Sequence, residues 1–213
     1  MLNELVEVRL DKFLIYSSNE LDGYGYQTAA DAVSCFNYFS NGKKYKHCLE
    51  WCSGPGYLGF ATLSQQLTKK LTLLDIYKPN GIAIKKSIEK NNLNEVVNFE
   101  ASNNFKNINE DKKFDLVIGN PPHFNFTPSY GNIDQNEHRK YQDKNWDIHR
   151  DFFKNVNDYT TADVDIMLME NTKGSNPDTF KKMIEDNNLT IKNYCQSVSY
   201  PNDIWYIHIT KSL

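Results

Sequence analysis

Residues 52–59 read CSGPGYLG and place Gly54, Gly56 and Gly59 at the spacing G-x-G-x-x-G. Glycines at this spacing, between a strand and a helix, let the backbone approach a nucleotide-type cofactor closely. The stretch before them, YKHCLEW (45–51), is apolar enough for a buried strand, and a helix is expected to follow. The loop predicts an α/β fold with a cofactor site, but it does not by itself identify the cofactor.

Strands and helices alternate along the rest of the chain. Besides 45–51, buried strands are expected at LTLLD (71–75), VVNFEAS (96–102), FDLVIG (114–119) and DVDIMLME (163–170). Helices are expected at about 28–39, 57–69, 79–92 and 176–189. Antiparallel hairpins are expected at 190–211 and at 5–16, the latter within a short N-terminal extension, 1–27. We therefore expect one α/β domain, 1–213, with a mostly parallel sheet, helices on both faces and an antiparallel edge.

Composition and charge narrow the classes of function. The chain has 213 residues, of which 39% are hydrophobic and 24% charged, which is ordinary for a globular domain. Its net charge of -3 gives no overall electrostatic footprint for nucleic acid, although a local basic patch would suffice. No apolar run approaches the roughly 18 residues that cross a membrane, and the charged start MLNELVEVRLDKF lacks a signal-peptide core. We expect a cytoplasmic protein that does not bind membranes.

Metal sites and disulfides are not expected. Cys48 and Cys52 are the only near neighbours among the four cysteines, and they do not form a C-x-x-C pair. His123, His138 and His149 lie in one polar stretch, but no pair of them has the spacing of zinc ligands. The sequence therefore predicts reduced thiols and no bound metal.

The acidic residues at two strand ends discriminate between cofactors. Glu50 ends the strand before the glycine loop, where its carboxylate would repel the pyrophosphate of a dinucleotide. The same carboxylate would attract the ammonium and sulfonium groups of S-adenosylmethionine. Asp75 ends the next strand and can accept the ribose hydroxyls of either cofactor, with a helix N-cap as its alternative role. Glu50 thus favours S-adenosylmethionine over a nicotinamide cofactor.

The stretch DLVIGNPPHF (115–124) adds a motif suited to binding an amine. Two prolines after a buried strand fix the backbone and remove N–H donors, so that the carbonyls of Asn120 and Pro121 point outward. The Asn120 side-chain oxygen and the Pro121 carbonyl can accept both hydrogens of a planar NH₂ group. His123 can stack on the plane of that group or act as a general base. The motif completes the argument for S-adenosylmethionine.

With these motifs, the chain resembles class I S-adenosylmethionine-dependent methyltransferases of the subgroup with an N-P-P-[YFHW] motif, over about residues 20–213. That subgroup includes adenine-N6 and guanine-N2 methyltransferases of DNA and RNA, and glutamine-N5 methyltransferases of release factors. The resemblance implies a Rossmann-like seven-stranded sheet in the order 3-2-1-4-5-7-6, with strand 7 antiparallel. The sequence departs from the family at Cys52, where a glycine is usual, and at Asn103, where an aspartate is common.

The resemblance also implies roles for individual residues. The catalytic residues would be those of the amine motif: Asn120, Pro121, Pro122 and His123. The cofactor contacts would come from the glycine loop and from the segments GYGYQT, LLD, EASNNF and NPPHF: Gln27, Thr28, Glu50, Cys52, Gly54, Gly56, Asp75, Ile76, Ser102, Asn103 and Asn120. Because family members carry Phe or Tyr in the position of His123, stacking is favoured over proton transfer for this ring.

We expect methyl transfer to a planar amine, and the acceptor is left open. The favoured acceptor is the exocyclic amine of a nucleobase, adenine N6 or guanine N2. The alternatives are a protein glutamine, a small amine, or a catalytically weak protein that only binds. The stretch 120–150 is expected to be either a mobile loop facing the substrate or a solvated loop. In the first case Phe124, Arg139, Trp146 and Arg150 would contact the substrate. RNA is favoured over DNA, because no target-recognition domain is recognisable, and the oligomeric state is left open.

Overall fold

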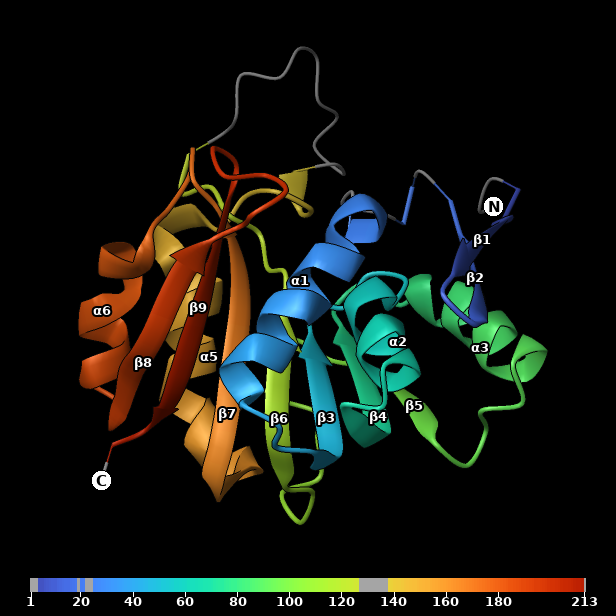
Figure 1. Cartoon of the computed structure of the whole chain (residues 1–213), viewed down its shortest axis with the longest axis horizontal. Coiled ribbons are helices and arrows are strands. Elements are labelled where there is room, and N and C mark those ends of the chain that lie inside the picture. Colours follow the sequence, from blue (N-terminus) through green and yellow to red (C-terminus); the bar gives the residue numbers. More distant parts are fainter. Residues whose placement is uncertain (1–3, 19, 22–24, 127–137, 213) are drawn as a thin grey trace.

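The computed structural model describes residues 4–18, 20–21, 25–126 and 138–212, and a seven-stranded sheet forms its centre (Figure 1). The strands are β3 (Tyr45–Trp51), β4 (Thr68–Asp75), β5 (Val97–Ala101), β6 (Phe114–Gly119), β7 (Thr160–Asn171), β8 (Leu189–Gln196) and β9 (Ile204–Lys211). Their order across the sheet is β5-β4-β3-β6-β7-β9-β8. β9 is antiparallel to β7 and β8, and the other neighbouring pairs are parallel. The predicted order 3-2-1-4-5-7-6, with strand 7 antiparallel, is confirmed.

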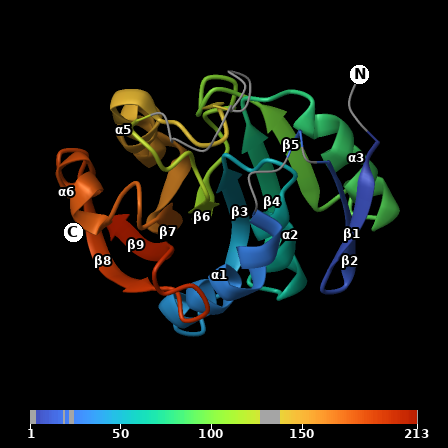
Figure 2. The ribbon, with the colours of Figure 1, turned by 90° about the horizontal axis from the view of Figure 1, so that it is seen from above.

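Helices cover both faces of the sheet (Figure 2). One face carries α1 (Gly25–Ser40), α2 (Tyr57–Ser64) and α3 (Asn80–Lys90), and the other carries α5 (Asp147–Asn155) and α6 (Pro177–Glu185). Successive side chains of a strand point to opposite faces, so Leu116 and Ile118 of β6 pack with the first group of helices and Val117 with the second. None of the helices in the described part of the chain has the length and apolar character needed to cross a bilayer.

The predicted N-terminal hairpin is present, outside the main sheet, as β1 (Val6–Leu10) and β2 (Phe13–Ser17). Asn91, just after α3, fixes the hairpin by two hydrogen bonds to Leu14. Its side chain accepts one from the Leu14 N–H (3.0 Å) and donates one to the Leu14 carbonyl (2.7 Å). The apolar side chains of the hairpin belong to the same core cluster as those of α1, α2 and α3, so the hairpin is an integral part of this layer.

Three helix boundaries differ from the prediction, and one of them is the end of α6 at Glu185 rather than near residue 189. α1 begins at Gly25, so Thr28 lies in its first turn and donates to the Gly25 carbonyl (3.2 Å) instead of capping the helix. α2 ends at Ser64 rather than near residue 69, because Gln66 has a left-handed φ of 56° that stops the helix before β4.

The polar stretch 120–150, predicted to be a loop, contains the start of α5. The Asp143 carboxylate accepts hydrogen bonds from the backbone N–H groups of Ile148 (2.9 Å) and His149 (3.1 Å). It thereby satisfies donors in the first turn, which have no partner within the helix. A short 3-10 turn, η1 (Lys144–Trp146), precedes α5. Residues 127–137 lie outside the described residues, and the predicted mobility of this loop lies outside them too.

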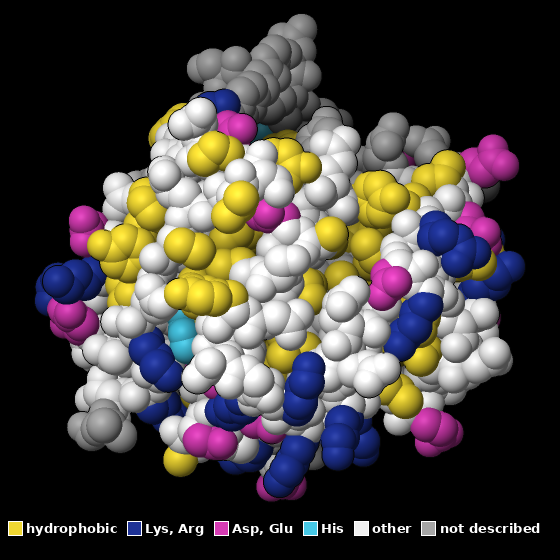
Figure 3. Space-filling view, viewed as in Figure 1, with side chains coloured by type: hydrophobic (Ala, Val, Ile, Leu, Met, Phe, Trp, Pro, Cys, Tyr) yellow, Lys and Arg dark blue, Asp and Glu magenta, His cyan; other side chains and the backbone are white. Residues whose placement is uncertain are grey.

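Basic side chains are unevenly distributed over the surface. In Figure 3, Lys and Arg side chains gather along the lower edge of the molecule, where Figure 1 places the amino ends of the central strands. Exposed lysines precede or begin β3, β4 and β6: Lys44, Lys46, Lys70 and Lys113. This edge is opposite to the carboxyl ends of the parallel strands.

Candidate functional site

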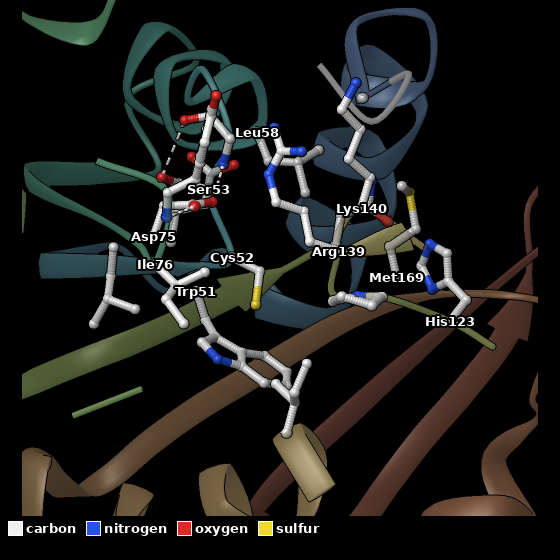
Figure 4. Close-up of a pocket in the computed structure, with 18 of the residues that line it drawn as sticks. Trp51, Cys52, Ser53, Leu58, Asp75, Ile76, His123, Arg139, Lys140 and Met169 are labelled. Atoms are coloured by element: carbon white, nitrogen blue, oxygen red, sulfur yellow. Dashed lines mark hydrogen bonds between the residues drawn. The ribbon is translucent and has the colours of Figure 1, made fainter. Parts of the chain in front are cut away.

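A pocket of about 980 Å³ lies at the carboxyl ends of β3, β4, β6 and β7 (Figure 4). Ligands of open α/β sheets bind at this edge. The pocket is lined by most of the residues predicted to contact a cofactor: Thr28, Glu50, Cys52, Gly54, Asp75, Ile76, Ser102, Asn103 and Asn120. Four residues predicted for catalysis or substrate binding also line it: Pro122, His123, Phe124 and Arg139. Motifs far apart in the sequence therefore meet at one site.

The glycine loop has the backbone conformation that its sequence predicted. Cys52, Gly54 and Gly56 have left-handed φ values of 54°, 52° and 91°. At Gly56 a side chain is excluded for a second reason, because an added Cβ would lie 2.7 Å from Leu73 Cδ1. Cys52 adopts a conformation that disfavours most residues with a Cβ. Glycine would adopt the same left-handed conformation without this steric cost.

Glu50 has a contact within the protein that the sequence did not reveal. Its side chain is buried, and Oε2 accepts a hydrogen bond from the Gly59 N–H (2.8 Å) in the first turn of α2. Gly59 permits this approach, because an added Cβ would lie 2.5 Å from the same oxygen. Burial raises the pKa of Glu50 to about 8. The residue is thus both a cap for α2 and a carboxyl group at the wall of the pocket.

Asp75 fixes the two loops at the end of β4. One carboxylate oxygen accepts from the Tyr77 N–H (2.7 Å) and the other from the Gly54 N–H (2.8 Å). Burial raises the pKa of Asp75, and these backbone donors oppose the rise. The Asn80 side chain gives the carboxylate a third hydrogen bond, and about one acceptor position remains for a ligand.

The residues after β5 connect the pocket to the opposite helix layer. Ser102 and Asn103 line the pocket. The next residue, Asn104, accepts from Trp51 Nε1 (2.7 Å) and donates to the Ile148 carbonyl (3.1 Å). The sequence analysis missed Asn104, because nothing in the local sequence distinguishes it from Asn103.

Asn120 presents an acceptor that nothing else in the described chain uses. It follows β6 and lines the pocket, and its Oδ1 is buried without a hydrogen-bond partner among the described residues. Buried polar atoms are nearly always paired in native proteins, because an unmet one costs free energy. A ligand with an N–H group would satisfy this oxygen.

His123 belongs to a chain of ionisable groups that the sequence analysis did not foresee. Its Nδ1 lies 3.2 Å from Oε2 of Glu170, and Oε1 of Glu170 lies 3.0 Å from Nε2 of His149. Nδ1 of His149 lies 2.6 Å from Oδ2 of Asp143. Glu170 lies at the end of an apolar strand, and an acid at that place could have been noticed in the sequence. Its partners could not, because they come from distant segments.

Segment 138–142 forms one side of the pocket. Arg139 donates to the Glu20 carbonyl (2.8 Å), and its guanidinium lies over the Tyr77 ring, 3.8 Å from the centroid. Lys140 lines the pocket beside it. The segment is joined to Phe124, whose N–H donates to the Tyr141 carbonyl (2.9 Å). Two cationic side chains therefore stand at the pocket, as Figure 4 shows.

Other predicted site residues do not line the pocket. The prediction that Trp146 stacks on a substrate is wrong, since its ring is buried against Phe180 and His149. Arg150 is exposed and donates to the Asn145 carbonyl (3.1 Å), away from the pocket. Three more predicted site residues do not line the pocket. They are an exposed residue of α1, a glycine that packs on the sheet and a buried proline: Gln27, Gly56 and Pro121.

The described residues contain no group of three metal-ligating side chains. All four cysteines are free thiols. Cys48 is buried, which raises the pKa of its thiol. The Cys35 and Cys195 sulfur atoms, from α1 and β8, lie 3.3 Å apart, a proximity that the sequence did not indicate.

Comparison with known proteins agrees with this geometry. Residues 33–135 match the family model described as methyltransferase small domain. This match places the first part of the fold, from α1 to the residues after β6, among sequences similar to the methyltransferase small domain. The sheet order and the pocket at the strand ends are those that the resemblance implied.

Two curated methyltransferases resemble parts of this chain. Ribosomal RNA small subunit methyltransferase D of Haemophilus influenzae is 31% identical over 112 residues, which cover 49% of this chain and 58% of that protein. Release factor glutamine methyltransferase of Fusobacterium nucleatum is 38% identical over 73 residues, which cover 33% of this chain and 20% of that protein. The chain thus spans less than two thirds of the length of either relative.

Among solved structures, TrmK of M. capricolum in complex with S-adenosyl-homocysteine has a similar fold. The TM-score is 0.60 at 14% sequence identity, and the match covers 83% of this chain and 67% of that chain. This likeness supports the shared methyltransferase fold.

Proposed function

We propose that the chain binds S-adenosylmethionine in the pocket and transfers its methyl group to a planar amine nitrogen. The favoured acceptor is the exocyclic amine of an RNA base, adenine N6 or guanine N2. The observation that carries the proposal is the buried Asn120 Oδ1, which has no hydrogen-bond partner among the described residues and lies at the pocket wall.

The residues of the pocket fit this cofactor. Asp75 accepts from two backbone N–H groups and from the Asn80 side chain, which leaves about one acceptor position for a ribose hydroxyl. Ile76 is 62% exposed at the pocket wall, an apolar surface that an adenine ring would cover. Ser102 and Asn103 offer polar atoms beside it, and Glu50 offers a carboxyl group for the cationic end. When bound, the cofactor would supply a methyl group activated by its sulfonium.

Asn120 would position and activate the acceptor nitrogen. The lone pair of an exocyclic amine or an amide is delocalised, which makes the nitrogen a poor nucleophile. A hydrogen bond from this nitrogen to Asn120 Oδ1 favours tetrahedral geometry and localises the lone pair. Because the bond strengthens as the methyl group arrives, it stabilises the transition state more than the bound substrate.

The preference for RNA rests on two observations. The relative from Haemophilus influenzae, which matches 49% of this chain, is by its name a methyltransferase of ribosomal RNA. Arg139 and Lys140 line the pocket, where cations would attract a phosphate backbone. Methylation of a protein glutamine uses the same hydrogen bond to Asn120, and the relative from Fusobacterium nucleatum makes it the competing outcome.

The test of the site compares Asn120→Ala with Asn98→Ala, which alters an exposed residue on β5. We expect both variants to bind S-adenosylmethionine like the wild type in titration calorimetry. Asn120→Ala should lose about a hundredfold or more in turnover, the usual effect of removing one positioned hydrogen bond in a transition state. Unchanged turnover in Asn120→Ala would show that the motif does not act on the acceptor.

The acceptor is identified by mass spectrometry of nucleosides and of peptides from cells with and without the gene. A methylated adenine or guanine that disappears from RNA with the gene supports the proposal. A methylated glutamine that disappears instead replaces RNA by protein as the acceptor. Failure of the purified chain to bind S-adenosylmethionine would overturn the proposal as a whole.

A further inference from the structure

A buried row of ionisable side chains extends from α5 to the pocket. Asp143, His149 and Glu170 have fully buried side chains, and each is within hydrogen-bond distance of the next. Glu170 is also bonded to His123 (3.2 Å) and accepts from the Ser175 hydroxyl (2.9 Å). His123 is the one member of the row that lines the pocket beside Glu170 and is partly exposed, with 14% of its side chain accessible.

The charges of this row are fixed by its members. Burial by itself lowers the pKa of His149, but the carboxylates of Glu170 and Asp143 raise it to about 9. Burial opposes ionisation of Glu170, yet His149 and His123 lower its pKa to about 2. At neutral pH, Glu170 is therefore a carboxylate, which can only accept hydrogen bonds. His123 must donate to it, so the proton of the neutral imidazole is on Nδ1 and Nε2 carries a lone pair.

The backbone of His123 is packed against the turn that follows β7. The turn after β7 packs directly on the motif, because a Cβ added to Gly174 would lie 2.2 Å from the His123 carbonyl oxygen and 2.7 Å from Phe124 Cδ1. Nε2 of His123 has no partner among the described residues. A ring that served only to stack on a substrate would need neither the buried carboxylate nor the second histidine behind it.

We propose that His123 Nε2 accepts the proton that the acceptor nitrogen loses, and that Glu170, His149 and Asp143 are positioning residues that hold the ring for this step. This inference rests on the proposed methyl transfer. As the nitrogen gains the methyl group it becomes positively charged; one N–H bond then breaks, its electron pair stays on nitrogen and its proton joins Nε2. The imidazolium so formed is paired with the Glu170 carboxylate and later gives the proton to water.

The row contains a histidine–carboxylate pair, His123 and Glu170, which His149 and Asp143 extend. A carboxylate behind an imidazole fixes its tautomer and stabilises its charged form. His149, held in turn by Asp143, keeps Glu170 from rotating away. The charged group bonded to His123 is Glu170 from β7, and the cationic side chains of Arg139 and Lys140 line the same pocket.

The first test reads the tautomer in the full-length free protein by long-range ¹H–¹⁵N spectra of its histidines. We expect the Nδ1–H form for His123 in the wild type and a shift toward Nε2–H in Glu170→Gln. Ser175→Ala is the matched control: it removes the serine donor from the same carboxylate, leaves the Glu170 bond to His123 intact and should keep the Nδ1–H form. A wild-type His123 with its proton on Nε2 would overturn the inference and leave the proposed function standing.

The second test measures transfer from S-adenosylmethionine to RNA isolated from cells lacking the gene, as a function of pH. His123→Phe keeps a flat ring, so it should retain cofactor affinity but lose about a hundredfold or more in turnover, the usual contribution of a general base. The pH profile of the rate should differ between the wild type and His123→Phe, because a phenyl ring takes up no proton. His47→Gln, at the amino end of β3, is the matched control and should behave like the wild type.

The outcomes separate the two proposals. If His123→Phe transfers at the wild-type rate with the same pH profile, the proton-accepting role is wrong and the methyltransferase function stands. If neither RNA nor any protein receives a methyl group from the wild type, the proposed function fails, and the inference falls with it.

Discussion

Glu50 should make the affinity for S-adenosylmethionine depend on pH. Burial holds its pKa at about 8, so the carboxyl group is mostly protonated in the free protein below that pH. A bound cation favours the carboxylate, so binding must release the proton, at a cost of 1.36 kcal/mol for each pH unit below the pKa. Between about pH 6 and about pH 7.5 the affinity should therefore rise by about 2 kcal/mol, about 30-fold. Higher pH is avoided, because the α-amino group of the ligand then loses its own charge.

Titration calorimetry in two buffers of different ionisation enthalpy measures both the affinity and the protons released. We expect close to one proton released per bound cofactor at about pH 6, decreasing as the pH approaches 8. Glu50→Gln is the matched variant, since its amide oxygen can still accept from the Gly59 N–H. It should release no proton, bind with an affinity that does not change with pH, and fall further below the wild type as the pH rises from about 6 to about 7.5.

Two results would refute this reasoning. One is an affinity that does not change over this pH range, with no protons released. The other is a Glu50→Gln variant that keeps the wild-type slope, which would assign the proton to a different group. In either case Glu50 would be a cap of α2 and no more.

Three further predictions concern single residues. Asp75→Ala should weaken cofactor binding by about 1.5–3 kcal/mol in calorimetry, since it removes a charged acceptor, and equal affinity would exclude the ribose role. Trp146→Ala should lower the free energy of unfolding in urea by about 3–5 kcal/mol, because the ring is buried against Phe180, whereas an exposed substrate contact would cost almost nothing. The stabilising contribution of His149 should decrease as the pH rises, because its pKa in the folded protein, about 9, exceeds the unfolded value. This contribution to the free energy of unfolding is complete below about pH 6.5 and is lost as the pH rises through about 9. The slope of unfolding free energy against pH should be smaller in His149→Gln, and an equal slope would contradict the assignment.

The sheet and the motif positions could be predicted because their signals are local. The central strands are buried on both faces and appear as short apolar runs, and each motif directly follows one of them. The glycine loop could be predicted for the same reason. Few residues other than glycine fit a position with a left-handed φ or with a close approach such as that at Gly56. Trp146 could not be placed, because an aromatic residue in a polar stretch has the same local sequence whether it is buried or exposed. What buries it is Phe180 on α6, which only the fold brings near.

The contacts between segments could not be predicted from local patterns at all. His149 and His123 meet on Glu170 from two different segments, and the intervals in sequence match no known motif. The sequence favoured stacking for His123, because members of the resembled family carry Phe or Tyr there, and no local pattern indicated a carboxylate behind the ring. The structure supplies that carboxylate, and with it a reason to consider proton transfer.

Polar residues stand at the ends of the four central strands, and they differ in whether the protein itself supplies their hydrogen-bond partners. The difference follows from their charge. Glu50, Asp75 and Glu170 are acids, and each is bonded to donors of the protein itself. A buried carboxylate without such donors would be costly, so these groups serve the fold first and a ligand second. Asn120 is neutral, and leaving one amide oxygen unmet costs only about 1–3 kcal/mol. An amide is thus the side chain that can remain buried and unpaired until a substrate donates to it, which accounts for Asn rather than Asp at the end of β6.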